Sequence, residues 1–456
     1  MADVEKALSA LQNVYHLDAE GRTAVTEAYE VFRAFHGPFI TSIATEMLPD
    51  LQDDAKTGRR IVFLGRDGHG FAAATRALAP KFFADHCTEV VLSRVVAEAA
   101  VQDLEVHRGT RFADIEGFRG TRNRVHPDDV PGAYRQLTAY LRGVDVPVGR
   151  PNSAVTVVDS SFKGTVQELL AATYPQTDFE GRYAFFGAAP DDSRAHRKHG
   201  YVVHLPAEQT GEGRGFPFDD LHPDPARTFA SKEPINAIED TLHGPMDTPL
   251  RITFGRPVQL PQRDDTEYLN GFNPILVPHR FRTPLTREAV KAAALLAVKD
   301  AAVEAAANRT RPGWLDGLRQ QRERFTFEMR QWVERSPQVD PSLKTVLDSF
   351  ARRVDHPVVS RLQHHLTVEG VSERDAAHLW QQVEAAPNRH ARAELVGALV
   401  QQSGASLVQR RVSSAAARKG STTGPTARKG SVAAGGQLPP HRRQGPEGTF
   451  GRDRGR

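Results

Sequence analysis

The sequence predicts an α/β fold with a Rossmann-like parallel sheet, a helical N-terminal cover, a C-terminal helical bundle and a disordered basic tail. Strand-like and helix-like segments alternate in the middle of the chain, helical periodicity flanks them on both sides, and the composition changes near residue 404. These changes divide the 456 residues into a helical cover at 1–55, an α/β domain at 56–283, a helical domain at 284–403 and a tail at 404–456.

The first 50 residues show the spacing of amphipathic helices. A Gly-Pro pair at 37–38 interrupts the pattern. The apolar residues at helical spacing are Val25, Ala28, Tyr29, Phe32, Phe35, Ile40, Ile43 and Met47. We expect these helices to cover one face of the sheet.

Short apolar runs alternate with amphipathic segments from Ile61 to about Val258. The segments are Ile61–Leu64, Phe71–Leu78, Glu89–Leu92, Ala154–Val158, Val166–Tyr174 and Tyr183–Gly187. This alternation predicts a parallel sheet with helices on its faces. The stretch from Ser193 to Pro234 is rich in Gly, Pro, His and Asp, which indicates either a lid over the site or a long surface loop.

Residues from about Thr286 to Gln402 are predicted to be entirely helical. Leu318, Phe325, Met329 and Trp332 recur at helical spacing, and Ser372 followed by Asp375 resembles a capping box. A small bundle of this kind is able to cover the site, dimerise or bind a protein partner, and its periodicity does not choose among these roles.

The positive charge of the chain lies in its last 53 residues. These residues carry a net charge of +9, so the whole-chain value of +3 leaves −6 for residues 1–403. Nucleic-acid binding is therefore expected only through the tail, if at all. A basic segment recurs there, at Ala417–Ser421 and Ala427–Ser431, so the tail is either a solvated extension or an arm that binds polyanions or is phosphorylated.

Composition also limits the cellular setting. No run approaches the roughly 20 apolar residues that a membrane span requires, and the acidic start of the chain is unlike a signal peptide. A single cysteine excludes an internal disulfide and a multi-cysteine zinc site. We expect a cytoplasmic protein without a membrane partner.

Two strand-to-helix loops carry the candidate functional residues. In the first, Arg66 follows a predicted strand and is suited to bind a phosphate group in a fork, while Gly68 lets the backbone approach closely. Asp67 is a candidate metal ligand or catalytic base. The structural alternative is that Arg66 and Asp67 form a buried ion pair between strand ends.

The second loop follows the strand that ends at Asp159. Asp159 is a candidate catalytic group and metal ligand, and Lys163 and Gly164 are candidate phosphate binders. Thr165 is able to give a hydroxyl and an N–H group to a phosphate oxygen or to cap the following helix. Ser93 and Arg94, which end another strand, are a third polar pair at the same sheet edge and further candidate phosphate binders.

Together the loops predict a phosphorylated small molecule as ligand and Mg²⁺ as cofactor. Free backbone N–H groups, helix N-termini and fixed cations at the carboxyl edge of a sheet favour phosphate, and hard carboxylate ligands favour Mg²⁺. No nucleophile elbow, Walker loop or dinucleotide fingerprint is present.

At these residues the chain resembles a bacterial family, found in polysaccharide gene clusters, of haloacid dehalogenase superfamily hydrolase-like proteins. The likeness rests on the segments His36–Phe39, Arg66–Gly68, Ser93–Arg94, Asp159–Gln167 and Glu239–Pro245. The resemblance implies hydrolysis or another phosphoryl reaction. The chain departs from the superfamily in lacking the Asp-x-Asp phosphatase motif, because His69 stands where the second Asp belongs.

The same loops are also similar to type I phosphoribosyltransferases, which bind pyrophosphate and ribose 5-phosphate after successive strands. That resemblance implies phosphoribosyl pyrophosphate as a substrate, although Asp159 is followed by Ser160 instead of a second acid. A third possibility is a non-catalytic module that senses a phosphorylated ligand and recruits a partner. Composition and spacing do not decide among the three.

Overall fold

The protein is described here from a computed structural model. The structure describes residues 2–66, 68–160, 162–210, 216–261, 276–353, 356–386 and 390–401, without the side chains of 2–4 and 356–357. The predicted tail and Asp67 therefore lie outside the described residues.

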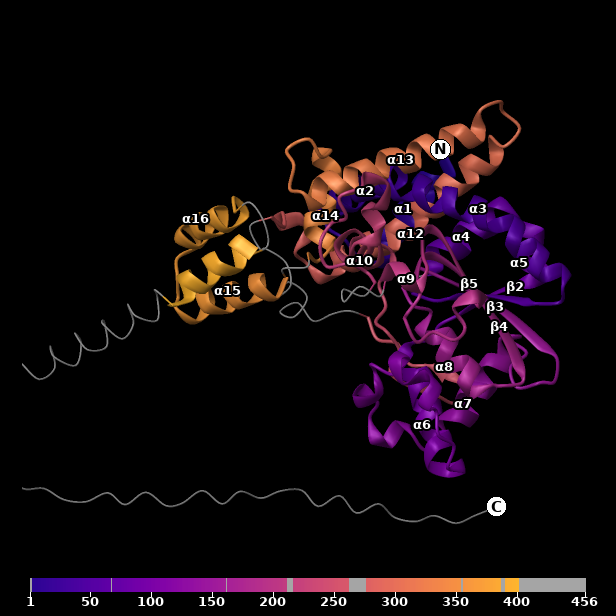
Figure 1. The fold of residues 1–456 in the computed structure, drawn as a ribbon. Coiled ribbons are helices and arrows are strands. Elements are labelled where there is room, and N and C mark those ends of the chain that lie inside the picture. The colour runs from indigo at the N-terminus through magenta and orange to yellow at the C-terminus, as the bar shows by residue number, and fades with distance from the viewer. Residues whose placement is uncertain are drawn as a thin grey trace, which may run out of the picture. The chain divides into compact units, whose positions relative to one another are not determined.

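A parallel sheet forms the centre of the fold, as the sequence predicted, and it has five strands (Figure 1). Its order is β2-β1-β3-β4-β5. The strands are β1 (Arg60–Leu64), β2 (Cys87–Val90), β3 (Ser153–Asp159), β4 (Thr177–Gly187) and β5 (Lys198–Leu205). In register, Ile61 lies between Cys87 on β2 and Thr156 on β3. The inner strands are Val- and Phe-rich because helices bury both of their faces.

Helices cover the sheet on two sides. They are α1 (Ala2–Val14), α2 (Ala19–Ala34), α3 (His36–Lys56), α4 (His69–Leu78), α5 (Pro80–His86), α6 (Arg94–Arg108), α7 (Ala133–Gly143), α8 (Thr165–Thr173), α9 (Ala207–Thr210), α10 (Lys232–Leu242), α12 (Pro284–Ala307), α13 (Trp314–Val333), α14 (Pro341–Phe350), α15 (His356–Val368) and α16 (Glu373–Glu384). Residues 390–401 are also helical. A two-stranded antiparallel sheet, β6 (Ile252–Thr253) and β7 (Arg256–Pro257), follows α10.

Short 3-10 turns complete the described elements. They are η1 (Ala113–Phe118), η2 (Arg122–Arg124), η3 (Pro127–Asp129), η4 (Ala195–Arg197), η5 (Pro225–Ala230) and η6 (His279–Phe281).

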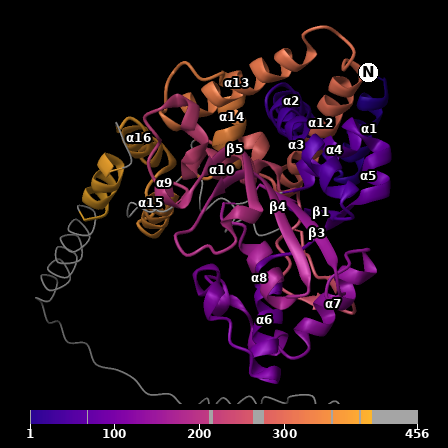
Figure 2. The same cartoon turned by 45° about the vertical axis from the view of Figure 1, so that its right-hand side comes forward.

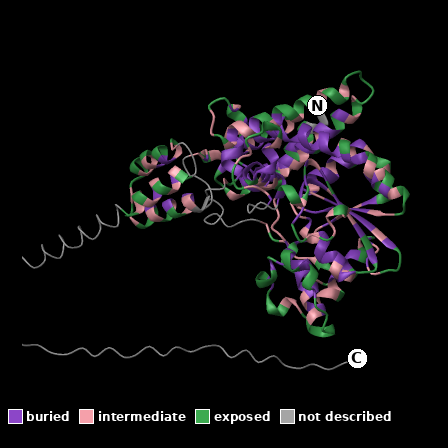
Figure 3. Cartoon of the chain, viewed as in Figure 1, coloured by how far each residue is buried: buried purple, intermediate pink, exposed green. Residues whose placement is uncertain are grey.

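Alternate residues of β1 enter two different hydrophobic cores. Ile61 and Phe63 pack with α2–α5 and α12, whereas Val62 and Leu64 pack with α6, α7 and α8. Figure 2 shows these two helical groups on opposite sides of the strands, and Figure 3 shows that the strands between them are buried. The fold is therefore doubly wound. Because successive side chains of a strand point to opposite faces of the sheet, each strand packs against both helical layers.

The N-terminal cover is confirmed, and it shares its core with C-terminal helices. Asp18 caps α2 by accepting a hydrogen bond from the Gly21 N–H at 2.7 Å, and the helix ends at Phe35, next to the predicted Gly-Pro interruption. Helix α12 packs against α2, α3 and α4. Helices that precede the sheet in the sequence and helices that follow it therefore contribute to one hydrophobic core.

Several predicted helical features of the C-terminal half are confirmed. Leu318, Phe325, Met329 and Trp332 are all buried, and Ser372 accepts a hydrogen bond from the Asp375 N–H at 3.2 Å. Helices α15 and α16 pack into a small hydrophobic cluster with Val396. Within the described ranges, no helix is both long enough and apolar enough to cross a membrane.

The strand predictions are wrong in three places. Strand β2 covers Cys87–Val90 instead of Glu89–Leu92. Strand β4 begins at Thr177 instead of Tyr183, and β5 lies inside the stretch that was predicted to be a lid or a loop. The first half of β4 alternates charged residues with others, and β5 begins with a charged residue, which makes both look like surface segments in the sequence. Their charged residues form ion pairs in the fold. Lys198, for example, begins β5 and is buried against two carboxylates.

Candidate functional site

The two predicted loops follow the adjacent central strands β1 and β3. The chain leaves β1 for β2 through α4 and α5 on one face of the sheet, and it leaves β3 for β4 through α8 on the other face. Strand order reverses between these two strands. In open parallel sheets, ligands bind outside the carboxyl ends of the strands at such a reversal. The topology thus brings Arg66 and Asp159 to the edge where a ligand is expected.

The first loop turns so tightly that Arg66 adopts a left-handed backbone, with φ +86°. The Gly68 N–H donates to the carbonyl oxygen of Leu64 at 2.8 Å, and the Gly65 N–H donates to Val90 at 2.6 Å. Non-glycine residues rarely adopt this conformation, and strained positions of this kind cluster at functional sites. The Arg66 guanidinium donates a hydrogen bond to the Thr248 hydroxyl.

The contacts of His69 argue against a role as the second acid of the first loop. Its Nδ1 lies 3.1 Å from a carboxylate oxygen of Glu89 on β2, and Arg76 pairs with the same carboxylate. The hydrogen bond from His69, together with Arg76, keeps the pKa of Glu89 below its usual range despite its partial burial. His69 therefore serves to attach the start of α4 to β2.

Replacing Gly68 with alanine is expected to destabilise the protein by about 2–3 kcal/mol. A Cβ at this position would lie 2.3 Å from the carbonyl oxygen of Leu64, so the turn must open and lose its hydrogen bond. Urea unfolding measures the change in the free energy of unfolding.

Gly70, in the first turn of α4, is the matched control. An added Cβ there meets only the Ile40 side chain, at 3.6 Å. Gly70→Ala is therefore expected to be neutral or to gain up to about 1 kcal/mol from helix propensity. Equal losses in the two variants would contradict the close packing described for Gly68.

The second loop is attached to β4 and to α10. The Phe185 N–H donates to the Ser160 carbonyl at 3.0 Å, and the Ser160 hydroxyl donates to Glu239 at 2.8 Å. The Ser160 N–H also donates to Oδ1 of Asp159 at 2.8 Å, which orients this carboxylate at the end of β3. The loop thus presents Asp159 in a fixed geometry.

Gly164, and not Thr165, is the N-cap of α8. Its backbone is left-handed, with φ +67°, and an added Cβ would lie 2.9 Å from the Tyr183 hydroxyl. Thr165 is the first residue of the helix, so the alternative that Thr165 caps α8 is wrong. Its prediction as a phosphate binder stands.

Two cations at this edge have side chains without partners among the described residues. Lys163 is partly exposed in the second loop, and Arg94 is exposed at the start of α6. Ser93 is different: it is buried, caps α6 by accepting from the Val96 N–H at 3.1 Å, and donates to the Pro249 carbonyl at 2.6 Å. Ser93 thus has a structural role, whereas neither cation forms an ion pair with a carboxylate of the residues that the structure describes.

One segment connects all three polar strand ends, and we call it the linking segment, residues 239–249. Its Glu239 accepts from Ser160 after β3, its Thr248 accepts from Arg66 after β1, and its Pro249 carbonyl accepts from Ser93 after β2. The sequence indicated the acidic part of this segment but not the last two contacts. The linking segment therefore contacts the residues that follow the carboxyl ends of β1, β2 and β3.

A buried ion cluster lies directly behind the second loop. The Lys198 Nζ is 2.7 Å from both Glu168 and Asp192, and all three side chains are at most 1% exposed. The same ammonium donates to the Lys163 carbonyl at 3.3 Å. Burial raises the pKa of Asp192, against the opposing effect of Lys198. This cluster supports the loop that carries Lys163 and Gly164.

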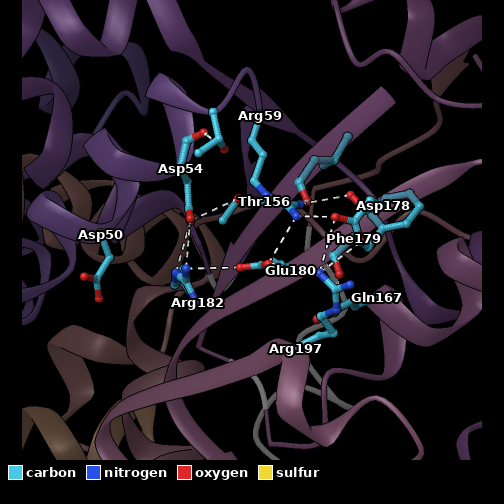
Figure 4. A network of polar contacts seen from close by, with 12 residues as sticks. Asp50, Asp54, Arg59, Thr156, Gln167, Asp178, Phe179, Glu180, Arg182 and Arg197 are labelled. Carbon is cyan, nitrogen blue, oxygen red and sulfur yellow. Dashed lines mark hydrogen bonds and ion pairs between the residues drawn. The ribbon is translucent and has the colours of Figure 1, made fainter. Parts of the chain in front are cut away.

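A larger polar network lies near the other end of the strands, where α3 crosses the sheet. Asp54 accepts from Arg182 at 2.9 and 3.1 Å and from Thr156 at 3.1 Å. Figure 4 shows Asp54 between these two residues, and Glu180 continues the network to Arg59 and Arg197. Its charges are satisfied by one another, so we interpret it as a structural attachment of α3.

Only one of the two predicted metal ligands, Asp159, lies within the described residues. No group of three or more His, Cys, Asp or Glu side chains able to hold a metal ion occurs within the described ranges. Asp67, one of the two predicted ligands, lies outside them. Mg²⁺ therefore stays a prediction that depends on Asp67 and Asp159.

No protein-family model matches the chain, and no curated protein and no solved structure matches it. The geometry of this edge of the sheet is therefore the evidence on function.

Proposed function

We propose that the protein is an enzyme that acts on a phosphorylated metabolite, such as a sugar phosphate or nucleotide, at the β1/β3 edge of the sheet. The observation that carries the proposal is the position of Arg66. It combines a strained backbone, a place at the reversal of strand order and a guanidinium oriented by the linking segment. An arginine fixed in this way suits a phosphate group better than a surface ion pair.

The neighbouring residues suggest roles in the reaction. Arg66 and Lys163 would neutralise phosphate oxygens, and the first N–H groups of α8 would donate to them. Fixed positive charge of this kind stabilises a phosphoryl transition state more than the ground state. Asp159, with Asp67, would supply an acid–base group or Mg²⁺ ligands. Hydrolysis of the haloacid dehalogenase-like type is the reaction that we propose first.

A ligand screen tests the proposal. We expect sugar phosphates or nucleotides to raise the melting temperature of the full chain, with a larger shift in the presence of Mg²⁺. Lys163→Met should reduce the shift, because one phosphate cation is lost. Lys56→Met is a matched control, since Lys56 is exposed near the opposite end of the sheet.

The reaction is identified by what happens after binding. Phosphate release from the binding ligand, lost in Asp159→Asn, supports hydrolysis. Pyrophosphate release from phosphoribosyl pyrophosphate would instead assign a phosphoribosyltransferase, and binding without turnover would assign a sensing module. If no phosphorylated compound changes the melting temperature, the site is not a phosphate site.

A further inference from the structure

A buried lysine on α12 lies beside the proposed phosphate site. Lys291 is 4% exposed, and its Nζ is 2.9 Å from Nε2 of His243, the residue that ends α10 and belongs to the linking segment. Buried lysines usually pair with carboxylates. The imidazole of His243 is able to accept a hydrogen bond from Lys291, but in its neutral form it adds no negative charge that would favour the ammonium.

The direction of the hydrogen bond follows from the other side of the imidazole. Nδ1 of His243 lies 2.8 Å from the Glu239 carbonyl, which only accepts, so Nδ1 carries a hydrogen. In the neutral ring, Nε2 must then accept from Lys291. Both the ammonium and the neutral amine are able to donate this bond. Gain or loss of one proton by Lys291 therefore leaves the contact intact.

The surrounding charges favour the neutral amine. Burial, and after it Arg287 on α12, Arg352 after α14 and Arg66, together lower the pKa of Lys291 to about 7, against the opposing effect of Asp240 on α10. Asp240 is itself paired with Arg352 at 2.9 Å. Among the described residues, the charged groups that shift the pKa of Lys291 are mostly positive, and an anion would balance them.

We propose that Lys291 and His243 form a proton-accepting pair, which takes up one proton when a dianionic phosphate binds beside Arg66. This inference rests on the proposed phosphate site. A dianion next to Arg66 reverses the sign of the local field, so the ammonium form of Lys291 becomes favoured. A phosphate monoester, with its two charges, is then a better ligand than a phosphodiester, with one.

The sign of the pH dependence follows from linkage. Binding raises the pKa of Lys291, so protonation strengthens binding and affinity falls as pH rises above about 7. We expect uptake of about half a proton or more at pH 8 and of ~0.1 proton at pH 6, where the pair is already charged. Affinity for a dianion should fall about five- to tenfold from pH 6 to pH 8.

Calorimetry with sulfate tests this inference, because sulfate is a dianion that does not titrate in this range. The proton count comes from the dependence of the observed enthalpy on the ionisation enthalpy of the buffer. Glucose 6-phosphate is the second probe at pH 8, where it is a dianion. Lys291→Met should bind without proton uptake and with an affinity that is flat from pH 6 to pH 8. Lys299→Met, on the exposed side of the same helix, should behave like the unmodified protein.

The outcomes separate the two proposals. Binding of either probe without proton uptake by the unmodified protein would overturn the role of Lys291 and leave the phosphate site standing. Unchanged proton uptake in a folded Lys291→Met variant would do the same. If neither sulfate nor glucose 6-phosphate binds at any pH, the phosphate site fails and the inference fails with it. Lys291→Gln, which is neutral and still able to donate a hydrogen bond to His243, replaces Lys291→Met if that variant does not fold, and it should likewise bind without proton uptake.

Discussion

Replacing Arg66 with glycine is expected to abolish ligand binding and, at the same time, to stabilise the fold. The left-handed backbone of Arg66 costs a non-glycine residue about 1–2 kcal/mol, and glycine removes that cost. The lost contact to Thr248 is partly exposed, so water replaces it. Loss of a bidentate guanidinium should reduce phosphate affinity about 100-fold or more. Thermal unfolding and calorimetry with glucose 6-phosphate measure the two effects.

A matched control separates strain from function. His16 is an exposed residue between α1 and α2 that also has a positive φ, of 50°. His16→Gly should raise stability in the same way without changing affinity. If Arg66→Gly binds glucose 6-phosphate as well as the unmodified protein, Arg66 is not a phosphate ligand. If the Arg66→Gly variant is clearly less stable than the unmodified protein, the backbone of Arg66 is not strained.

Replacing Lys198 with methionine is expected to cause the largest loss of stability, about 3–5 kcal/mol. The substitution removes the only ion-pair partner of Asp192 among the described residues and one of two partners of Glu168, while both carboxylates stay buried. An uncompensated buried charge is much more costly than the loss of an exposed pair. Lys56→Met, which removes an exposed pair with Asp53, should change little.

The deficit of Lys198→Met should depend on pH. Burial already raises the pKa of Asp192, and without Lys198 that pKa rises further. A raised carboxylate pKa in the folded state contributes stability at low pH that is lost as pH rises through it. The difference from the unmodified protein should therefore be larger at pH 8 than at pH 5, as measured by urea unfolding. A deficit that is equal at both pH values would mean that the cost comes from packing and not from charge.

Local sequence patterns were sufficient to predict the central strands and the two loops. Runs such as Ile61–Leu64 are apolar because both faces of an inner parallel strand are buried, so the run itself indicates its place in the sheet. The loops were recognisable because glycine and charged residues follow these runs directly. The parallel sheet and the strand-end position of Arg66 and Asp159 followed from these patterns.

The outer strands and the partners of the candidate site residues depend on contacts between distant parts of the chain. Strands β4 and β5 contain Glu180, Arg182 and Lys198, which look like solvated residues in the sequence because their partners lie on other elements. Thr248 and Lys291 carry no local motif either. Each matters only because the fold places it next to a group more than 40 residues away. Periodicity and spacing carry no information on such pairings.

The linking segment has a consequence for how the protein is made on the ribosome. Its hydrogen bond to Arg66 joins residues 182 positions apart, and its contact with Ser93 joins residues 156 positions apart. All five strands of the sheet are synthesised before residue 239, whereas Lys291 follows still later. A nascent chain is thus able to pair its strands early, but the proposed phosphate site is completed only after α12 has emerged. The proposed site is therefore assembled after the sheet that carries it.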